Sequence, residues 1–203
     1  MEEELARVGP VVAGLAGVAA VSIDTSKAAV AEVALDAGAT IVNDVTALSH
    51  DIEMGALCAE RGAGLVLMHM QGDPRTMQAD PSYGDVVDDV KAFLAERMEA
   101  AVGMGVAEEL IWLDPGIGFG KTLDHNLELL RRLGELRELG RPLVVGTSRK
   151  SFIGKIDGSA VGERLGGTIA SSVLAAADGA DVLRVHDVAE TAQATQVASA
   201  ILG

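Results

Sequence analysis

Short runs of apolar and β-branched residues alternate with longer amphipathic segments along the whole chain. The runs that read as strands lie at residues 21–23, 40–42, 65–68, 110–113, 143–145 and 182–185. Apolar residues recur at helical spacing between them, as in 86–101 and 123–133, and the chain opens on another helical segment, 2–15. This alternation predicts an α/β fold in which crossover helices join parallel strands.

The ends of the predicted helices carry residues typical of helix caps. Four glycines stand just before a strand, where a left-handed C-cap is expected: Gly38, Gly62, Gly140 and Gly179. Thr122 precedes a leucine-rich stripe and is predicted to be its N-cap. These signals support the assignment of the intervening segments as helices.

The strand–helix units number six, whereas an eight-stranded barrel typically needs about 250 residues. We therefore predict one domain, residues 1–203, of the (β/α)8 TIM-barrel type, incomplete, with about six parallel strands and surrounding helices. The opening helix should follow a strand, so the missing part is expected at the amino end. An open, six-stranded, doubly wound sheet is the alternative.

Incomplete closure would leave the strands near residues 21 and 185 as sheet edges, which favour association. A helix in the last third also carries a face of small and apolar residues, namely Ala170, Val173, Leu174 and Ala177. Together these features predict a homodimer.

Composition narrows the classes of function. The chain has 16 Lys and Arg against 30 Asp and Glu, a net charge of −14, which argues against general affinity for nucleic acid. No apolar stretch reaches the roughly 20 residues of a membrane span, so no membrane partner is expected. The single cysteine, Cys58, favours a reducing compartment, and a cytoplasmic location is predicted.

Each predicted strand is followed by polar or charged residues. In chain order they are Asp24, Asn43, His69, Asp114, Ser148 to Lys150, and Arg184 to His186. In parallel α/β folds the chemistry lies at the carboxyl ends of the strands, because the strand interiors are covered by helices. The pattern therefore predicts a single site assembled from several strand ends.

Three of these strand ends carry short hydrogen-bonding side chains, Asp24, Asn43 and Asp114. Carboxylates accept hydrogen bonds from the N–H groups of a flat heterocycle, and an amide can donate and accept. The alternative is that each side chain caps the helix that follows it. Taken together with Lys150, the ligand-binding interpretation is favoured.

Residues 114–121 read DPGIGFGK, in which alternating glycines allow a sharp turn and close approach to a ligand. A nucleotide-binding phosphate loop would need glycine where Pro115 stands, so that interpretation is disfavoured. Phe119 is a candidate aromatic wall for a substrate, or else an anchor of the loop.

Basic residues gather at or after the last two strand ends: Arg149, Lys150, Lys155, Arg184 and His186. In an acidic chain this cluster predicts a pocket for a small anion, with scattered surface charge as the alternative. Arg184 and His186 alternate onto one side of their strand, a geometry suited to phosphate. An ion pair with Asp187 or Glu190 is the competing interpretation.

Met68, His69 and Met70 end the third run. A metal site at His69 would need companion ligands that the sequence does not supply at suitable spacing. Met68 and Met70 point the same way, and their thioethers could pack against a ligand ring or belong to the core.

Five segments, taken in order, resemble the dihydropteroate synthase family, which joins a pterin pyrophosphate to p-aminobenzoate in folate biosynthesis. They are SIDTSKAAVAEVALDAGATIVNDV from residue 22, LMHMQGDPRTMQ from 67, LDPGIGFGKTLDHN from 113, GTSRKSFIG from 146 and LRVHDV from 183. The resemblance covers nearly the whole chain and implies a TIM-barrel transferase that is a target of sulfonamides.

The resemblance also implies roles for individual residues. Asp24, Asn43, Asp114 and Lys150 would hold the pterin, with Met68 near its ring; Arg184 and His186 would bind the pyrophosphate; Ser148, Lys150 and Phe119 would border the p-aminobenzoate site, and Gly146 belongs to the substrate-binding set. Asp114 and Lys150 are the expected catalytic residues. Pyrophosphate is implied to depart before the arylamine attacks the pterin methylene.

The chain departs from the family at its amino end. The family's first strand, a mobile loop whose Asn helps to bind Mg²⁺, the second strand and a Ser-Thr-Arg-Pro loop have no counterpart. Mg²⁺ is the cofactor that the resemblance implies, although no residue of this chain is assigned as its ligand. Two alternatives stay open, a pterin-binding methyltransferase and a non-catalytic pterin-binding relative.

Overall fold

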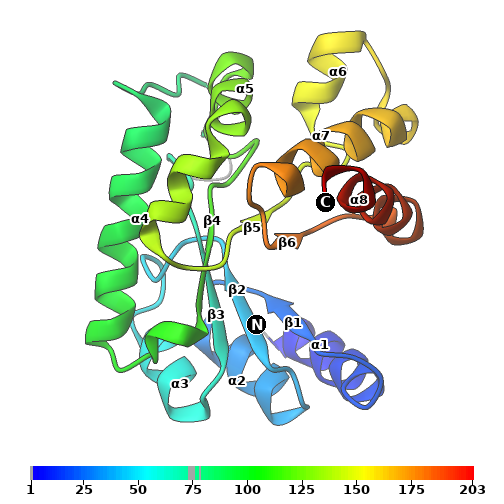
Figure 1. Ribbon diagram of the computed structural model, residues 1–203. Helices are drawn as coiled ribbons and strands as arrows, with labels where there is room; N and C mark the ends of the chain where they lie inside the picture. The colour runs from blue at the N-terminus through cyan, green and yellow to red at the C-terminus, as the bar shows by residue number, and fades with distance from the viewer. Residues whose placement is uncertain (1, 73–75, 78) are drawn as a thin grey trace. The chain divides into compact units, whose positions relative to one another are not determined.

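The computed structural model describes residues 2–72, 76–77 and 79–203 and contains the predicted alternation of strands and helices (Figure 1). Residues 73–75 and 78, within the LMHMQGDPRTMQ segment, lie outside the described part. The chain forms two compact units. The first comprises Met1–His69 and Phe93–Leu113, and the second comprises Met70–Ala92 and Asp114–Gly203.

The first unit holds the strands β1 to β4 and the helices before and between them. In chain order its elements are α1 (Glu2–Leu15), β1 (Ser22–Asp24), α2 (Ala28–Asp36), β2 (Ile41–Asp44), α3 (Glu53–Arg61), β3 (Gly64–Met68), α4 (Val86–Gly103), the 3-10 helix η1 (Glu108–Leu110) and β4 (Ile111–Asp114). The boundary between the units falls inside α4 and at the end of β4. The predicted opening helix, residues 2–15, is confirmed.

These four strands form one sheet in the order β1-β2-β3-β4. β1 pairs in parallel with β2, with Asp24 opposite Asn43, and β2 pairs in parallel with β3. A doubly wound sheet reverses its strand order at a switch point, whereas the strands of a barrel follow one another in sequence. The order therefore identifies an α/β fold of partial-barrel type and argues against the doubly wound alternative for these strands.

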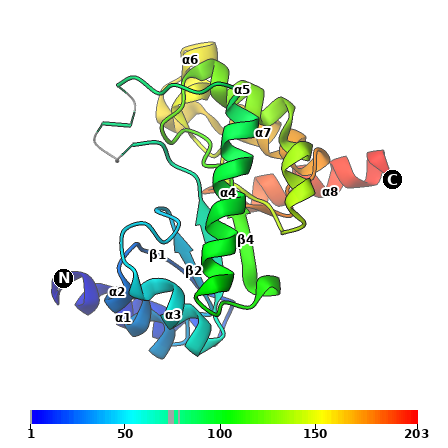
Figure 2. The same ribbon diagram turned by 90° about the vertical axis from the view of Figure 1, so that its left-hand side faces the viewer.

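The core of the first unit lies on both faces of its central strands. β3 is buried from Leu65 to Met68 without alternation, as expected for a parallel strand covered on both sides. Helices α1, α2 and α3 lie side by side (Figures 1 and 2), and Val12 and Ala34 form a small cluster between α1 and α2. Val21 and Ile23, at β1, pack against this cluster.

The second unit carries the last two strands and most of the later helices. Its elements are α5 (Leu123–Arg131), the 3-10 helix η2 (Leu133–Leu139), β5 (Val144–Val145), α6 (Ser151–Asp157), the 3-10 helix η3 (Val161–Glu163), α7 (Leu165–Ala177), β6 (Val182–Leu183) and α8 (Val188–Leu202). β5 and β6 pair in parallel as a two-stranded sheet. β6 is shorter than the predicted strand 182–185, although the Arg184 N–H still donates to the Val145 carbonyl at 3.0 Å.

The helix boundaries agree with the capping signals. Thr122 is the N-cap of α5, and its hydroxyl accepts the His125 N–H while the His125 ring accepts the Thr122 N–H. Gly62 and Gly140 are left-handed C-caps, with φ of 60° and 69°. Gly38 and Gly179 adopt φ of 105° one residue beyond the C-cap.

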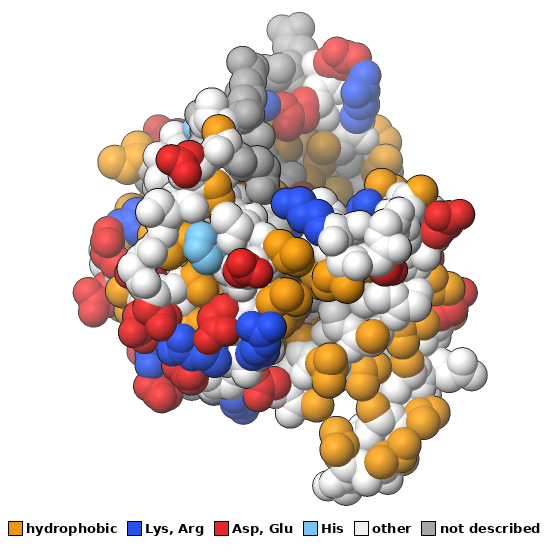
Figure 3. Space-filling model, turned by 90° about the horizontal axis from the view of Figure 1, so that it is seen from above, with side chains coloured by type: hydrophobic (Ala, Val, Ile, Leu, Met, Phe, Trp, Pro, Cys, Tyr) orange, Lys and Arg blue, Asp and Glu red, His pale blue; other side chains and the backbone are white. Residues whose placement is uncertain are grey.

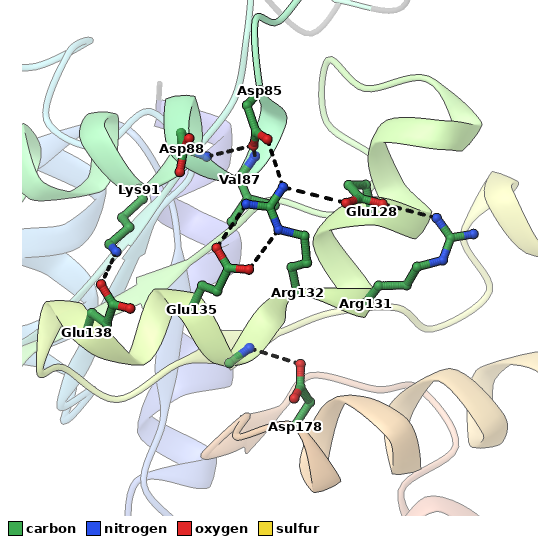
Figure 4. A network of polar contacts seen from close by, with 11 residues as sticks. Asp85, Val87, Asp88, Lys91, Glu128, Arg131, Arg132, Glu135, Glu138 and Asp178 are labelled. Carbon is green, nitrogen blue, oxygen red and sulfur yellow. Dashed lines mark hydrogen bonds and ion pairs between the residues drawn. The ribbon is translucent and has the colours of Figure 1, made fainter.

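A polar network on the surface of the second unit ties the start of α4 to the end of α5 and to η2 (Figure 4). The Arg132 guanidinium bonds to Asp85 at 2.8 Å and to both carboxylate oxygens of Glu135 at 2.7 and 2.9 Å. Lys91 pairs with Glu138 in the same network. In the described part of the chain, no helix is both long and apolar enough to cross a membrane.

Candidate functional site

The first unit brings two of the predicted site residues together at the ends of β1 and β2. Asp24 and Asn43 are register partners, and the Asn43 amide donates to Asp24 Oδ1 at 2.7 Å. Asn43 is buried, whereas Asp24 is exposed. The amide therefore orients a carboxylate that faces solvent.

The helix-capping interpretation of Asp24 is not what the structure adopts. The N-cap position of α2 is Lys27, which makes no side-chain cap. The first helical N–H, that of Ala28, donates instead to Asp51 Oδ2 at 2.8 Å. Asp51 comes from the segment before α3, so the caps of this region were not visible in the local sequence.

Asp44, the residue after Asn43, organises the following turn. Its Oδ1 accepts from the Thr46 N–H and hydroxyl at 2.9 and 2.7 Å, and its Oδ2 accepts from the Leu48 N–H at 2.8 Å. Ala47 and Leu48 have φ of 49° and 66°, a left-handed conformation that is unfavourable for residues with a Cβ. The buried Asp44 carboxylate stabilises this strained turn next to Asn43.

Met68 and His69 end β3 inside the first unit. Met68 is 1% exposed, so in this structure its thioether belongs to the core, and its predicted contact with a pterin ring stays a prediction. His69 is also buried and packs edge-to-face against Phe93, with ring centroids 4.9 Å apart. Within the residues described, no cluster of three or more His, Cys, Asp or Glu side chains could hold a metal ion.

Asp114 begins the glycine-rich loop of the second unit. It is 4% exposed, and its Oδ1 accepts the Gly116 N–H at 2.7 Å. Burial raises the pKa of the Asp114 carboxyl, and the positive charge of Lys150 opposes that rise most strongly. The Gly116 N–H and the charges of Arg184 and Lys121 act in the same direction as Lys150.

Lys150 reaches the glycine loop from the segment after β5. Its ammonium donates to the Ile117 carbonyl and lies 4.7 Å from the centroid of the Phe119 ring, a cation–π distance. Burial lowers the pKa of Lys150 to about 8, although the Asp114 carboxylate opposes that shift. The structure thus brings together three predicted site residues, Asp114, Phe119 and Lys150.

A second lysine in this region was not predicted. Lys121, the last residue of DPGIGFGK, is 1% exposed, and burial lowers its pKa to about 7. The signal was present in the sequence as a lysine directly before the N-cap Thr122. The phosphate-loop motif places a lysine at this position to bind phosphate, whereas Lys121 donates to carbonyls of its own loop.

The ends of β5 and β6 bring together the other predicted residues. Ser148 Oγ lies 2.8 Å from His186 Nδ1 and also accepts the His186 N–H at 3.2 Å. When Ser148 donates its proton to Nδ1, the neutral ring carries its proton on Nε2. A Cβ added at Gly146 would lie 3.8 Å from Arg184 Nε, an ordinary van der Waals contact, so Gly146 is a neighbour of Arg184.

The predicted basic cluster divides into residues with different roles. Arg149 forms a two-point ion pair with Asp187, Nε to Oδ2 at 3.1 Å and Nη2 to Oδ1 at 2.5 Å. Its φ is 56°, and its N–H donates to Thr168 Oγ1 at 3.0 Å. Lys155 is exposed in the last turn of α6. Arg149 thus shapes the backbone that holds Ser148 and Lys150.

The second unit contains groups that suit a planar ring and groups that suit an anion. Asp114 provides a buried acceptor beside a cation, and Phe119 provides an aromatic surface. Arg184 and His186, both exposed, follow a paired strand and provide donors for an anion. A ligand that combines a planar heterocycle with a phosphate group matches these features.

Comparisons with known proteins identify a family that binds a planar heterocycle, a pterin. The family model described as "Pterin binding enzyme" matches residues 1–186. Dihydropteroate synthase of Escherichia coli K12 is 47% identical over 206 residues, covering 100% of this chain and 72% of that enzyme. The Synechocystis enzyme is 46% identical over 204 residues, covering 99% of this chain and 71% of that enzyme.

Solved structures agree with the curated relatives. The Stenotrophomonas maltophilia dihydropteroate synthase with imidazole bound in its active site has a TM-score of 0.96 at 42% identity, covering 100% of this chain and 77% of that chain. The Thermus thermophilus enzyme in complex with 6HMPPP has a TM-score of 0.94 at 46% identity, covering 100% and 80%. The chain belongs to the pterin-binding enzyme family and, within it, to the dihydropteroate synthases, which are transferases of folate biosynthesis.

Proposed function

We propose that this chain transfers the pterin methylene of 6-hydroxymethyl-7,8-dihydropterin pyrophosphate to p-aminobenzoate, forming 7,8-dihydropteroate and pyrophosphate within one domain, residues 1–203. The observation that carries the proposal is the buried Asp114 carboxylate beside Lys150, in the unit that also holds Arg184 and His186. A xanthomonad relative of 41% identity is named as a complex with 7,8-dihydropteroate.

Pterin recognition is proposed for Asp24 and Asn43 in the first unit and for Asp114 and Lys150 in the second. Carboxylates accept the N–H groups of an aminopyrimidinone, and the Asn43 amide can donate to its oxygen. The raised pKa of Asp114 reflects how little water reaches it, which strengthens each hydrogen bond that it accepts from a ring. Met68 and Gly146 complete the proposed set.

The leaving group is proposed to bind at Arg184 and His186. As the C–O bond breaks, its electron pair goes to the pyrophosphate, and the permanent charge of Arg184 stabilises the anion that forms. Ser148 orients the His186 ring through its bond to Nδ1. The carboxylate of Asp114 stabilises the positive charge that develops on the pterin.

The second substrate is proposed to border Phe119, Ser148 and Lys150. The arylamine nitrogen forms the new C–N bond at the pterin methylene and then loses a proton, so the reaction needs no redox partner. The Phe119 ring supplies a surface for the benzoate ring, and the nearby Lys150 ammonium suits a carboxylate. Another solved structure of the same Xanthomonas albilineans enzyme holds 4-aminobenzoic acid.

The family uses Mg²⁺, which neutralises charge on pyrophosphate when it is bound. The described residues do not offer a group of three His, Cys, Asp or Glu side chains that fits a protein-bound metal. No step of the proposed reaction therefore depends on a metal held by this chain.

The test is to supply both substrates with Mg²⁺ and to measure pyrophosphate and 7,8-dihydropteroate together. Release of the two products in equal amounts, dependent on p-aminobenzoate, is the expected result. A methyltransferase would release no pyrophosphate. A folded chain that binds the pterin substrate in a calorimeter but forms no product would be a non-catalytic relative.

Self-association is proposed through the apolar surface of the second unit. An open groove of about 520 Å³ lies among α5, α6 and α7, and Ile156 and Leu174 beside it are 60% and 68% exposed. Figure 3 shows hydrophobic side chains gathered at the lower right, on the side where α8 lies in Figure 1. Leu174→Glu should convert a homodimer to a monomer in sedimentation velocity, and a monomeric parent chain would refute the proposal.

A further inference from the structure

Lys121 is a buried ammonium held by the loop that it ends. Its Nζ donates to the Gly116 carbonyl and to the Phe119 carbonyl, each at 3.0 Å. These two acceptors flank the middle of the DPGIGFGK segment. The side chain therefore folds back under the loop instead of extending into solvent.

Burial of an ammonium is unfavourable unless donors and charge are satisfied. The carbonyls satisfy two donors of Lys121, and the Asp114 carboxylate supplies an opposing charge. An apolar side chain of similar length would fill the space without the desolvation cost. The charge is thus better explained by its effect on the loop than by packing.

Other side chains complete the frame around the loop. Asn126 Oδ1 accepts the Gly118 N–H at 2.6 Å, and the Tyr83 hydroxyl donates to the Gly120 carbonyl at 2.7 Å. Gly116, Gly118 and Gly120 have φ of 66°, 84° and 59°. A backbone of left-handed glycines has little intrinsic preference for this shape, so the side chains must select it.

The loop residues that bind Lys121 also contact residues that are proposed to bind substrate. Phe119 supplies its carbonyl to Lys121 and its ring to Lys150. The intervening Ile117 supplies its carbonyl to Lys150. A Cβ added at Gly118 would lie only 3.1 Å from Lys150 Cδ, so the loop and this lysine are in close contact.

We propose that Lys121 is a positioning residue for the second substrate: by binding the carbonyls of Gly116 and Phe119, it sets the loop conformation that presents the Phe119 ring beside Lys150. The proposal rests on the proposed function insofar as Phe119 borders p-aminobenzoate. Of the two acceptors, Phe119 is itself a proposed arylamine contact, whereas Asp114 is held by its own bond to the Gly116 N–H, so the arylamine site depends on Lys121 more than the pterin site does.

The principal experiment is steady-state kinetics of the full chain with Lys121→Met, which keeps the length and removes the donors. The KM for p-aminobenzoate should rise tenfold or more, while the calorimetric Kd for the pterin pyrophosphate changes threefold or less. Lys121→Gln, which retains one donor pair, should lie between the parent and Lys121→Met and replaces it if that variant does not fold.

A control separates positioning from lost stability. Leu136→Ala truncates a buried side chain in the same unit, in η2, which is outside the loop segment 114–122. Compared at temperatures equally far below their unfolding midpoints, Leu136→Ala should keep the parent KM for p-aminobenzoate. The proposal is overturned if the control reproduces the rise in KM, or if Lys121→Met leaves the KM within twofold of the parent.

A second readout does not need activity. Hydrogen exchange in residues 114–122 should accelerate at least tenfold in Lys121→Met, while exchange in β5 stays unchanged. Unchanged exchange in 114–122 overturns the proposal whatever the kinetics show. If the parent chain forms no product, the proposed function fails, and the exchange measurement alone then decides whether Lys121 sets the loop.

Discussion

The two units place a strand-end carboxylate in opposite environments, exposed in the first unit and buried in the second. In the first unit, Asp24 is exposed and receives a hydrogen bond from a neutral amide, that of Asn43. In the second unit, Asp114 is buried, with two lysines and an arginine contributing to its electrostatics. Asp24 and Asp114, both at the carboxyl end of a strand, therefore differ in burial and in the charges around them.

The difference shows where the free energy of ligand binding should come from. An exposed carboxylate is well hydrated, and a ligand gains little by replacing that water. A buried carboxylate has already lost its water, so a ligand that donates to it recovers interaction free energy. We expect the second unit to dominate pterin affinity, and the following substitutions test that expectation.

Asp114→Asn should have the largest effect. It keeps the size of the side chain but replaces a charged acceptor by an amide that is a poorer partner for ring N–H groups. The Kd for the pterin pyrophosphate should rise about 100-fold, which corresponds to about 2.7 kcal/mol. Calorimetric titration with Mg²⁺ present measures it.

Asp124→Asn is the matched control for that substitution, because Asp124 lies in the first turn of α5 in the same unit and has no assigned role. The control should bind as the parent does. If Asp114→Asn binds within threefold of the parent, the pterin assignment of Asp114 is wrong and the contrast between the units disappears.

Lys150→Ala should come next. It removes the cation beside Asp114 and the contact with the Phe119 ring, so a charge-assisted interaction with substrate is lost. The Kd for the pterin pyrophosphate should rise about 30-fold, or about 2 kcal/mol. Lys155→Ala, in the exposed last turn of α6, should change the Kd less than twofold; equal effects from both variants would contradict the assignment.

The pH dependence of stability should separate the units as well. Lys121 and Lys150 have folded-state pKa values of about 7 and about 8, against an ordinary value of 10.5. Between the folded-state pKa and the ordinary pKa of each lysine, the unfolded chain binds more protons than the folded chain. Both lysines therefore make the free energy of unfolding rise with pH above about 7. The raised pKa of Asp114 acts oppositely: where the folded chain holds that proton above the ordinary pKa of 3.8, Asp114 makes the free energy of unfolding fall with pH.

Urea unfolding at pH 7, 8 and 9, followed by circular dichroism, tests this contribution. Lys121→Met should flatten the rise by up to about 1.4 kcal/mol per pH unit, the limit for one proton. Lys155→Met supplies the comparison, because it removes an exposed lysine from α6 in the same unit. Parallel slopes for Lys121→Met and the parent would show that Lys121 is not desolvated in solution.

The sequence was sufficient to predict the strands, helices and caps of this molecule but not the electrostatics of its site. Periodicity located the six strands of the described residues and the opening helix, and Thr122 was identified as a cap, because these depend on residues close in sequence. The frame around the glycine loop depends on Tyr83 and Asn126, which reach it from other segments. No local pattern encodes such contacts.

The same reasoning explains the surprises at Arg149 and Lys121. Arg149, at a strand end, was interpreted as a ligand for an anion. The structure pairs it with Asp187, which lies 38 residues further along the chain. Lys121 is buried against two loop carbonyls, although lysine side chains are usually exposed. Burial and partner choice are tertiary properties, so the chemical class of the site was predictable and its charge balance was not.

Asp24→Asn should have a smaller effect on binding than either substitution in the second unit. The side chain is exposed, and Asn43 can still donate to the new amide oxygen. The Kd for the pterin pyrophosphate should rise about fivefold, or about 1 kcal/mol. Asp36→Asn, on the surface at the end of α2, is the control. An effect as large as that of Asp114→Asn would mean that burial does not rank these carboxylates.

The smallest effect is expected from Arg132→Gln, in the surface network of Figure 4. Its partners Asp85 and Glu135 are 42% and 43% exposed, so water and salt screen the pairs. The thermal midpoint should fall by about 1–2 °C at low salt, and 0.5 M NaCl should remove most of the difference. A large, salt-independent fall would show that Arg132 supports the loop before α4 through packing. The buried charges around Asp114 would then no longer be unusual within the second unit, because a surface cation would stabilise the fold as strongly as the desolvated ones.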